Sequence, residues 1–182
     1  MTPTKIRALD AAIELVGTAG LRALTHARVD ERAGLPKGST SNYFRTRAAL
    51  TTGVVEWMAQ RELADMRPPE PPASAAGLVD LLSGMIEYAT GPNRTLTAAR
   101  ITLFGEAGHD PAIRAAVAGG HALMKSWAVA VLTGLGAADP GAGATALMNC
   151  CEGFILHRIA RGDTADPRPA LEVVVRGALG RP

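Results

Sequence analysis

The chain has 182 residues, of which 47% are hydrophobic and only 4% are aromatic, and its net charge at pH 7 is +2. This length suffices for a helical domain with a sizeable core and a small second domain. Abundant alanine and scarce aromatic residues favour helices and disfavour a β-sandwich. The small net charge excludes a polycation, but residues 1–50 hold eight Lys or Arg against four Asp or Glu. Positive charge is therefore concentrated where a phosphate-bearing partner would be attracted.

Apolar residues recur at three- and four-residue steps and predict an all-α fold of about nine helices. The first runs from Thr4 to about Ala19, two short helices flank Gly34, and a long fourth helix, capped by Thr46, runs to about Met66. A stiff connector, 68–72, follows because its four prolines cannot continue a helix. Further helices are expected over about 75–90, 93–108, 111–136, 139–162 and 169–179, each bounded by Gly, Pro or a capping residue.

The segment from Leu24 to Leu50 predicts a helix-turn-helix. Thr25 can cap the first helix, and Gly34 supplies the positive φ that a tight helix end favours. Pro36 suits the first turn of a helix, so the second helix is expected to begin at about Pro36. Its leading side chains are short, polar or basic, which is unlike a core-facing helix and is what entry into the DNA major groove requires. A merely structural helical hairpin is the alternative.

Individual side chains of this segment are candidates for DNA contact. Lys37 could donate to guanine, and Asn42 could pair with adenine. For base edges or a thymine methyl group the candidates are Ser39, Thr40 and Ser41. At the margins, where phosphates lie, the candidates are Thr25, His26, Tyr43 and Arg47. For each of these residues, solvent exposure without any contact is the alternative.

The same segment resembles the DNA-binding domain of the tetracycline-repressor (TetR) family of bacterial transcription regulators. The resemblance covers roughly the first fifty residues and rests on Thr25, Ala33-Gly34-Leu35, Gly38-Ser39, Phe44, Arg47 and Leu50. One departure is Ser41, which stands where family members usually carry an aromatic residue. The resemblance implies a helix-turn-helix domain over residues 1–48 and a helical ligand-binding and dimerisation domain over residues 49–182. It also implies a repressor that a small molecule releases from an inverted-repeat operator in double-stranded DNA.

Several side chains of the body could surround a small apolar effector, since a mostly apolar cavity with a few polar tips suits such a ligand. The candidates are Trp57, Met85, Tyr88, Phe104, His121, Met124, Trp127 and Phe154. The alternative is that they simply fill the core.

The last two predicted helices are apolar on more than one side, which predicts a homodimer interface. The resemblance implies the same arrangement, a four-helix bundle made from these helices. The candidate interface residues are Leu147, Cys151, Ile155, Leu171, Val174 and Ala178.

Catalytic and metal-binding patterns are missing from the sequence. The four histidines lie far apart without a carboxylate at metal-ligand spacing, and no nucleophile motif or phosphate-binding loop stands out. We therefore expect neither an enzyme nor a cofactor or metal. The alternative is a helical enzyme or small-molecule-binding protein whose N-terminal hairpin is incidental.

The adjacent Cys150 and Cys151 diverge by about 100° on a helix, so they make no ordinary bridge. They are interpreted as small core residues, with a thiol sensor as the alternative. Nothing at the N-terminus directs export, and the charge-free run 126–138 is too short to span a bilayer. These features predict a cytoplasmic protein.

Overall fold

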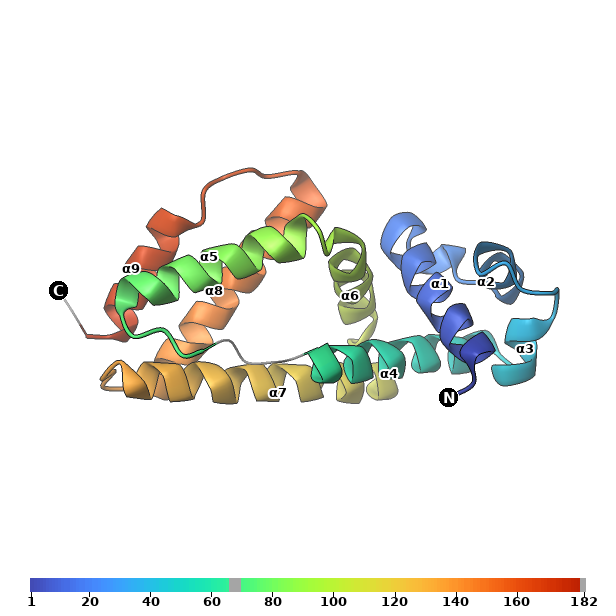
Figure 1. Ribbon diagram of the computed structural model, residues 1–182, viewed down its shortest axis with the longest axis horizontal. Helices are drawn as coiled ribbons and strands as arrows, with labels where there is room; N and C mark the ends of the chain where they lie inside the picture. The colour runs from blue at the N-terminus through green and yellow to red at the C-terminus, as the bar shows by residue number, and fades with distance from the viewer. Residues whose placement is uncertain (66–69, 181–182) are drawn as a thin grey trace. The chain divides into compact units, whose positions relative to one another are not determined.

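A computed structural model describes residues 1–65 and 70–180 of the chain, and Figure 1 shows its helices. Within those ranges the regular elements are nine α-helices and one short 3-10 helix, with no strand, which confirms the all-α prediction. No helix in the described ranges is both long enough and apolar enough to cross a membrane. The predicted end of the fourth helix at Met66 and the connector residues Pro68 and Pro69 lie outside the described residues.

The described chain divides into two compact units, one of Met1–Met66 with Thr95–Gly120 and one of Arg67–Arg94 with His121–Pro182. These compact units differ from the predicted domains 1–48 and 49–182. The predicted domains were defined by function, and they stay a prediction. Each unit has its own buried core.

The first unit contains α1 (Pro3–Ala19), η1 (Leu21–Ala23), α2 (His26–Arg32), α3 (Ser39–Tyr43), α4 (Arg47–Asp65), α6 (Arg94–Glu106) and the beginning of α7 (Pro111–Gly134). Helix α1 contacts α2, α3 and α4, so it packs behind the two short helices α2 and α3. Leu9, Leu24, Val29 and Leu50 are among the fully buried side chains between them. Thr46 accepts a hydrogen bond from the Ala49 amide at 3.1 Å, as a cap of α4 should.

Two glycines let helices of the first unit approach closely. A Cβ atom on Gly53 of α4 would lie 2.4 Å from the ring of Phe44, and one on Gly17 of α1 would lie 2.1 Å from the carbonyl oxygen of Thr95. Real Cβ atoms do not come so near other atoms. The lack of a side chain therefore sets how α4 packs behind α3 and how α6 packs on α1.

The second unit contains α5 (Ala75–Thr90), the end of α7, α8 (Pro140–Arg161) and α9 (Arg168–Ala178). Helices α5, α8 and α9 contact one another pairwise around a core that includes Ile86 and Leu132. Ser74 caps α5 by accepting from the Gly77 amide, and Asp139 caps α8 by accepting from the Ala142 amide. The predicted starts of both helices are confirmed.

Candidate functional site

The turn that follows α2 has the geometry expected for a helix-turn-helix. Thr25 caps α2, with its hydroxyl oxygen 3.4 Å from the Arg28 amide. At the other end Gly34 has φ 60°, and the Leu35 amide donates to the carbonyl of Asp30 at 2.8 Å. This pairing is a Schellman motif, which satisfies carbonyls left open at a helix end. The predicted capping role of Thr25 and the predicted turn at Gly34 are confirmed.

The second helix of the motif begins later than predicted. Helix α3 spans only Ser39–Tyr43, so the expected start at about Pro36 is wrong. Gly38, with φ 90° and ψ −4°, is left-handed, and a left-handed residue interrupts a right-handed helix. Lys37 therefore lies in the turn before α3, where its side chain is exposed.

A buried carboxylate that was not predicted from the sequence organises the start of α3. Asp30 is only 3% exposed. Its Oδ2 accepts from the Gly38 amide at 2.8 Å, and its Oδ1 accepts from the Thr40 amide at 2.8 Å and from the Thr40 hydroxyl at 2.5 Å. The sequence carries no clear sign of this role, because Asp30 is adjacent to the buried Val29 and adjacent side chains of a helix diverge by about 100°.

The bonds to Asp30 correct one predicted DNA contact. Thr40 is 0% exposed and faces the protein interior, so the expectation that it reads a base edge is wrong. Ser41 and Asn42 are exposed on α3, and Ser39 is half-buried. The Ser41 hydroxyl donates to the Gly38 carbonyl at 2.8 Å, so its lone pairs remain available as acceptors. Their proposed contacts with bases stay predictions.

Three residues predicted at phosphates also support the local fold. His26 Nε2 lies 2.6 Å from the carbonyl oxygen of Phe44, and the Arg47 guanidinium donates to the carbonyl of Leu21 at 2.8 Å. The Tyr43 hydroxyl, 40% exposed as a residue, accepts from the Thr2 hydroxyl at 3.1 Å. These bonds join the start of α2 to the end of α3, the start of α4 to η1, and the end of α3 to the residue before α1. A phosphate contact by any of these residues stays a prediction.

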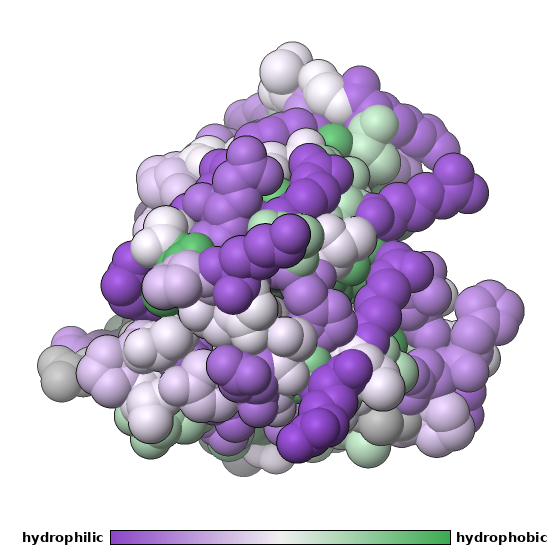
Figure 2. All heavy atoms as spheres, turned by 90° about the vertical axis from the view of Figure 1, so that its right-hand side faces the viewer, coloured by the Kyte–Doolittle hydropathy of each residue, from purple (hydrophilic) through white to green (hydrophobic). Residues whose placement is uncertain are grey.

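Basic side chains dominate the exposed charge of residues 1–50. Of the four acidic residues there, Asp30 is buried, Asp10 accepts from two side chains of α4, and Glu14 lies 3.6 Å from a guanidinium of α2. Figure 2 faces the side on which α2 and α3 lie in Figure 1 and shows mostly hydrophilic residues. The exposed basic residues of the segment are Arg7, Arg22, Arg28, Arg32, Lys37, Arg45 and Arg47.

Three of the predicted effector contacts are not placed as expected. The Trp57 indole donates to Asp10 Oδ1 at 2.8 Å, which also accepts from Arg61 at 2.9 Å, so Trp57 joins α4 to α1. Tyr88 is 60% exposed and Phe104 is 59% exposed, so neither lines an enclosed cavity here. Periodicity marked these residues as apolar or amphipathic, but it does not tell which of them a neighbouring helix covers.

The remaining effector candidates belong to the second unit. Met85, Trp127 and Phe154 are half-buried and pack against its core. The Trp127 Nε1 atom is buried without a hydrogen-bond partner among the described residues. Met124 is half-buried, and the exposed His121 lies 3.8 Å from Glu152.

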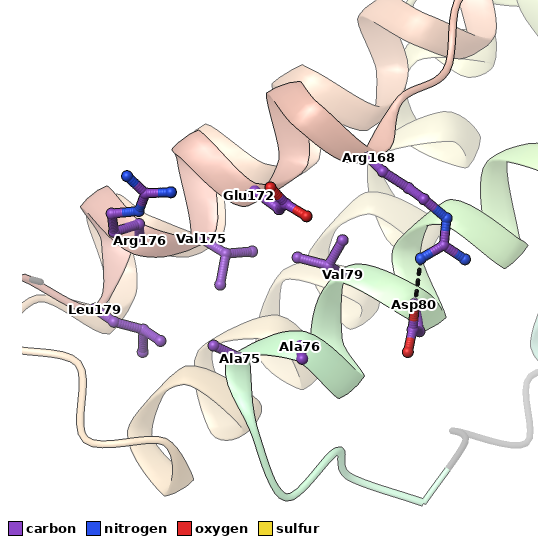
Figure 3. A pocket seen from close by; sticks show the side chains of 9 residues that line it. All are labelled: Ala75, Ala76, Val79, Asp80, Arg168, Glu172, Val175, Arg176 and Leu179. Carbon is purple, nitrogen blue, oxygen red and sulfur yellow. Dashed lines mark hydrogen bonds and ion pairs between the residues drawn. The ribbon is translucent and has the colours of Figure 1, made fainter.

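An open groove of about 430 Å³ lies on the second unit between α5 and α9 (Figure 3). Buried Val79 and Val175 form part of its floor, and an ion pair between Asp80 and Arg168 crosses one end. None of the predicted effector contacts lines it. The lining residues are Ala75, Ala76, Val79, Asp80, Arg168, Glu172, Val175, Arg176 and Leu179.

Two of the predicted dimer contacts are wrong. Leu147 is 3% exposed and Leu171 is 0% exposed, so both are already buried within one chain. The half-buried residues of the predicted set are Cys151, Ile155, Val174 and Ala178. The exposed large apolar residues of α8 and α9 were not predicted as interface residues, and they are Leu156, at 45%, and Val173, at 65%.

The two cysteines lie in environments that disfavour thiol reactivity. Both thiols are free, and burial, followed by the neighbouring thiol and carboxylate, raises the pKa of Cys151 to about 12. Burial also raises the pKa of Cys150. A thiolate is the reactive form, so these environments disfavour the thiol-sensor alternative. In the described part of the chain, no cluster of His, Cys, Asp or Glu could hold a metal ion.

A helix-turn-helix with an exposed polar edge, set on an otherwise helical chain, defines the class of helical DNA-binding regulators. A family model described as the tetracyclin repressor-like C-terminal domain matches residues 73–181. The chain belongs to this TetR-like family. It is therefore a DNA-binding transcriptional regulator and not an enzyme.

Several solved structures have a similar fold. A TetR transcription regulator from Haloarcula marismortui has a TM-score of 0.80 at 15% identity, covering 100% of this chain and 99% of that one. A TetR-family member from Streptomyces coelicolor has a TM-score of 0.69 at 26% identity, covering 96% and 98%. The multidrug binding protein EbrR, complexed with ethidium, has a TM-score of 0.71 at 23% identity, covering 95% and 97%. No match was found among curated protein sequences.

Proposed function

We propose that the chain is a cytoplasmic repressor that binds an inverted-repeat operator as a homodimer and leaves it when a small apolar molecule binds. The main support for DNA binding is the exposed edge formed by Lys37, Ser41 and Asn42, which lies beside a surface of basic side chains. Short polar side chains at the start of α3 suit a major groove, and the basic side chains suit its phosphate walls.

Each exposed side chain has a distinct role in this proposal. Lys37 donates to guanine O6 or N7 from the turn, and Asn42 makes the paired bonds to adenine. Ser41 accepts from a base amino group, since its own hydrogen is directed at a backbone carbonyl. The phosphate contacts come from Thr25, Tyr43 and Arg47.

Dimerisation is needed because one head reads only a short half-site. Two heads about 34–36 Å apart, or a multiple of that distance, match successive major grooves on one side of the duplex. The exposed Leu156 and Val173 lie on α8 and α9, and a second copy would cover them. We therefore propose that α8 and α9 of two copies form the dimer interface.

The effector site is proposed in the second unit around Trp127. Its buried, unpartnered indole N–H would gain a hydrogen bond from a ligand acceptor, and Met85 and Phe154 pack against the same core. Two similar structures are of EbrR with ethidium and with proflavin, at 23% and 25% identity. These planar dyes are therefore reasonable first probes of the protein in the absence of DNA.

The test starts from duplexes that the purified protein selects from a random pool, with affinity measured by fluorescence anisotropy at several salt concentrations. Lys37→Ala should cost about 1–3 kcal/mol at one base position and relax the choice there. Lys125→Ala, which removes the same side chain from an exposed position of α7, is the control and should leave binding unchanged. Failure to select any inverted repeat would refute the proposal, and equal loss on random duplexes would refute the role of Lys37.

Ligand release is tested with the same anisotropy assay. An effector can release the repressor from DNA only if it binds better to the DNA-free form. Linkage then requires that bound DNA lower the protein's affinity for the effector by the same factor. We expect a small apolar compound that binds around Trp127 to lower operator affinity, and saturating operator to lower the protein's affinity for that compound. A compound that binds with the same affinity in both conditions is not an effector.

A further inference from the structure

We infer that Asp30 is a positioning residue for DNA recognition: its buried carboxylate sets the start and orientation of α3 and thereby the selectivity between operator and other DNA. The inference rests on the proposed function, in which α3 reads base edges. It assigns a role to a residue that itself touches no DNA in that proposal.

Helix α3 cannot fix its own position. It has five residues, whereas isolated helices shorter than about 12 residues are marginal in water. Its N-cap residue is Gly38, which has no side chain with which to bond the open amides of the first turn. The acceptor that an N-cap side chain would normally supply comes instead from Asp30, on the preceding helix.

The three bonds define both the turn and the helix. Oδ2 accepts a hydrogen bond from the Gly38 amide, and Oδ1 accepts from the amide and the hydroxyl of Thr40. The carboxylate therefore holds the residues on both sides of Ser39. The backbone carbonyl of Asp30 accepts from Leu35 as well. One residue of α2 thus bonds the beginning and the end of the connection to α3.

Burial makes this arrangement stringent. A charge removed from water is tolerated only when donors replace its hydration, and at 3% exposure Asp30 depends on these three donors. The negative charge also lies at the N-terminal end of α3, where the helix dipole favours it. The carboxylate therefore tolerates few other placements of the turn.

Selectivity follows because the proposed readers adjoin the anchored residue. Ser41 and Asn42 come directly after Thr40 on the same short helix, and a tilt of α3 would move both relative to the base edges. Paired hydrogen bonds to bases demand a fixed geometry. Contacts between flexible basic side chains and phosphates do not, so a loosened α3 should lose selectivity before it loses general affinity for DNA.

The test compares Asp30→Asn with Glu31→Gln in the full-length protein. Each change removes one negative charge, from adjacent positions of α2, but Glu31 is exposed whereas Asp30 is buried. An asparagine at 30 has the same shape, yet its amide would turn a donor towards the donor of Gly38 or Thr40. The measured quantity is the ratio of affinities for the selected operator and for a random duplex.

We expect Asp30→Asn to lower this ratio at least tenfold with an unchanged salt slope on random DNA, while Glu31→Gln keeps the wild-type ratio. Thr40→Ser, which retains the hydroxyl, should behave as wild type, and Thr40→Val should give a smaller loss in the same direction. A wild-type ratio in Asp30→Asn would overturn the inference. So would equal loss on both duplexes, which indicates damage to the whole head. If Asp30→Asn does not fold, a wild-type ratio in Thr40→Val overturns it.

A second readout does not depend on DNA. Hydrogen exchange at the Gly38 and Thr40 amides should accelerate in Asp30→Asn relative to Glu31→Gln, while amides in the middle of α1 keep their protection. Unchanged exchange at both amides would overturn the inference. Absence of any selective binding by the wild-type protein would instead refute the proposed function, so the two failures are distinguishable.

Discussion

Gly38→Ala should weaken operator binding through the backbone alone. Gly38 has φ 90° and ψ −4°, and a Cβ atom there would meet nothing closer than the Ser41 hydroxyl at 3.9 Å. Steric overlap with neighbours is therefore minor, and the cost comes from holding an L-residue in a left-handed conformation, about 1–2 kcal/mol. The turn can relieve this strain only by changing φ, which would move the amides that Asp30 binds. We expect operator affinity to fall about 5- to 30-fold, the equilibrium factor for that energy.

The matched control is Gly162→Ala at the end of α8. Gly162 has φ 68° and ψ 24°, and nothing lies within 4 Å of a Cβ placed on it, so it carries a similar backbone cost in the other unit. Thermal unfolding followed by circular dichroism should show a lower midpoint for both variants. Operator affinity, measured by anisotropy well below either midpoint, should fall only for Gly38→Ala. Equal affinities for the two variants would refute the reasoning that left-handed Gly38 sets the position of α3.

Three further predictions concern packing, thiol chemistry and assembly. Gly53→Ala should lower the unfolding midpoint, because the new Cβ would lie 2.4 Å from an aromatic carbon of Phe44. The control Gly84→Ala lies on an exposed helix face with nothing within 4 Å and should raise stability by up to about 1 kcal/mol. A higher midpoint for both variants would contradict the close approach at Gly53. With a pKa of about 12 instead of 9.0, Cys151 has about a thousandfold less thiolate at pH 8, so iodoacetamide should label it slowly in the native protein and quickly in denaturant, and rapid native labelling would contradict its burial. Val173→Asp should give monomers by light scattering with unchanged helical circular dichroism, because Val173 is 65% exposed and leaves the core intact; a dimeric variant would place the interface elsewhere.

Helix ends could be predicted from the sequence where a cap is local. Thr25, Ser74 and Asp139 each bond an amide three residues further on, so the residue type and its position are sufficient evidence. The left-handed turn at Gly34 is local in the same sense. The start of α3 was not predictable in this way, because its amides bond to a carboxylate eight and ten residues earlier.

Burial was less predictable than helicity. The apolar spacing that indicated α8 and α9 also marked Leu147 and Leu171 as interface candidates, yet both face the core of their own unit. Spacing identifies the apolar face of a helix, but the partner that covers the face depends on how several helices meet. The same reason explains Trp57, whose indole bonds a carboxylate 47 residues earlier in the chain.

The feature that indicated DNA binding also limited what the sequence could say about the site. A helix that enters a DNA groove needs short, polar side chains, so it buries too little apolar surface to hold itself in place. Its position must then be fixed by groups on other elements, here the Asp30 carboxylate behind Thr40 and the Phe44 ring against Gly53. One polar residue of the run must face inward to accept that support, and composition alone does not distinguish it from its exposed neighbours. Thr40 is that residue, which is why the polar run 37–42 indicated an exposed edge but not which of its members lie on it.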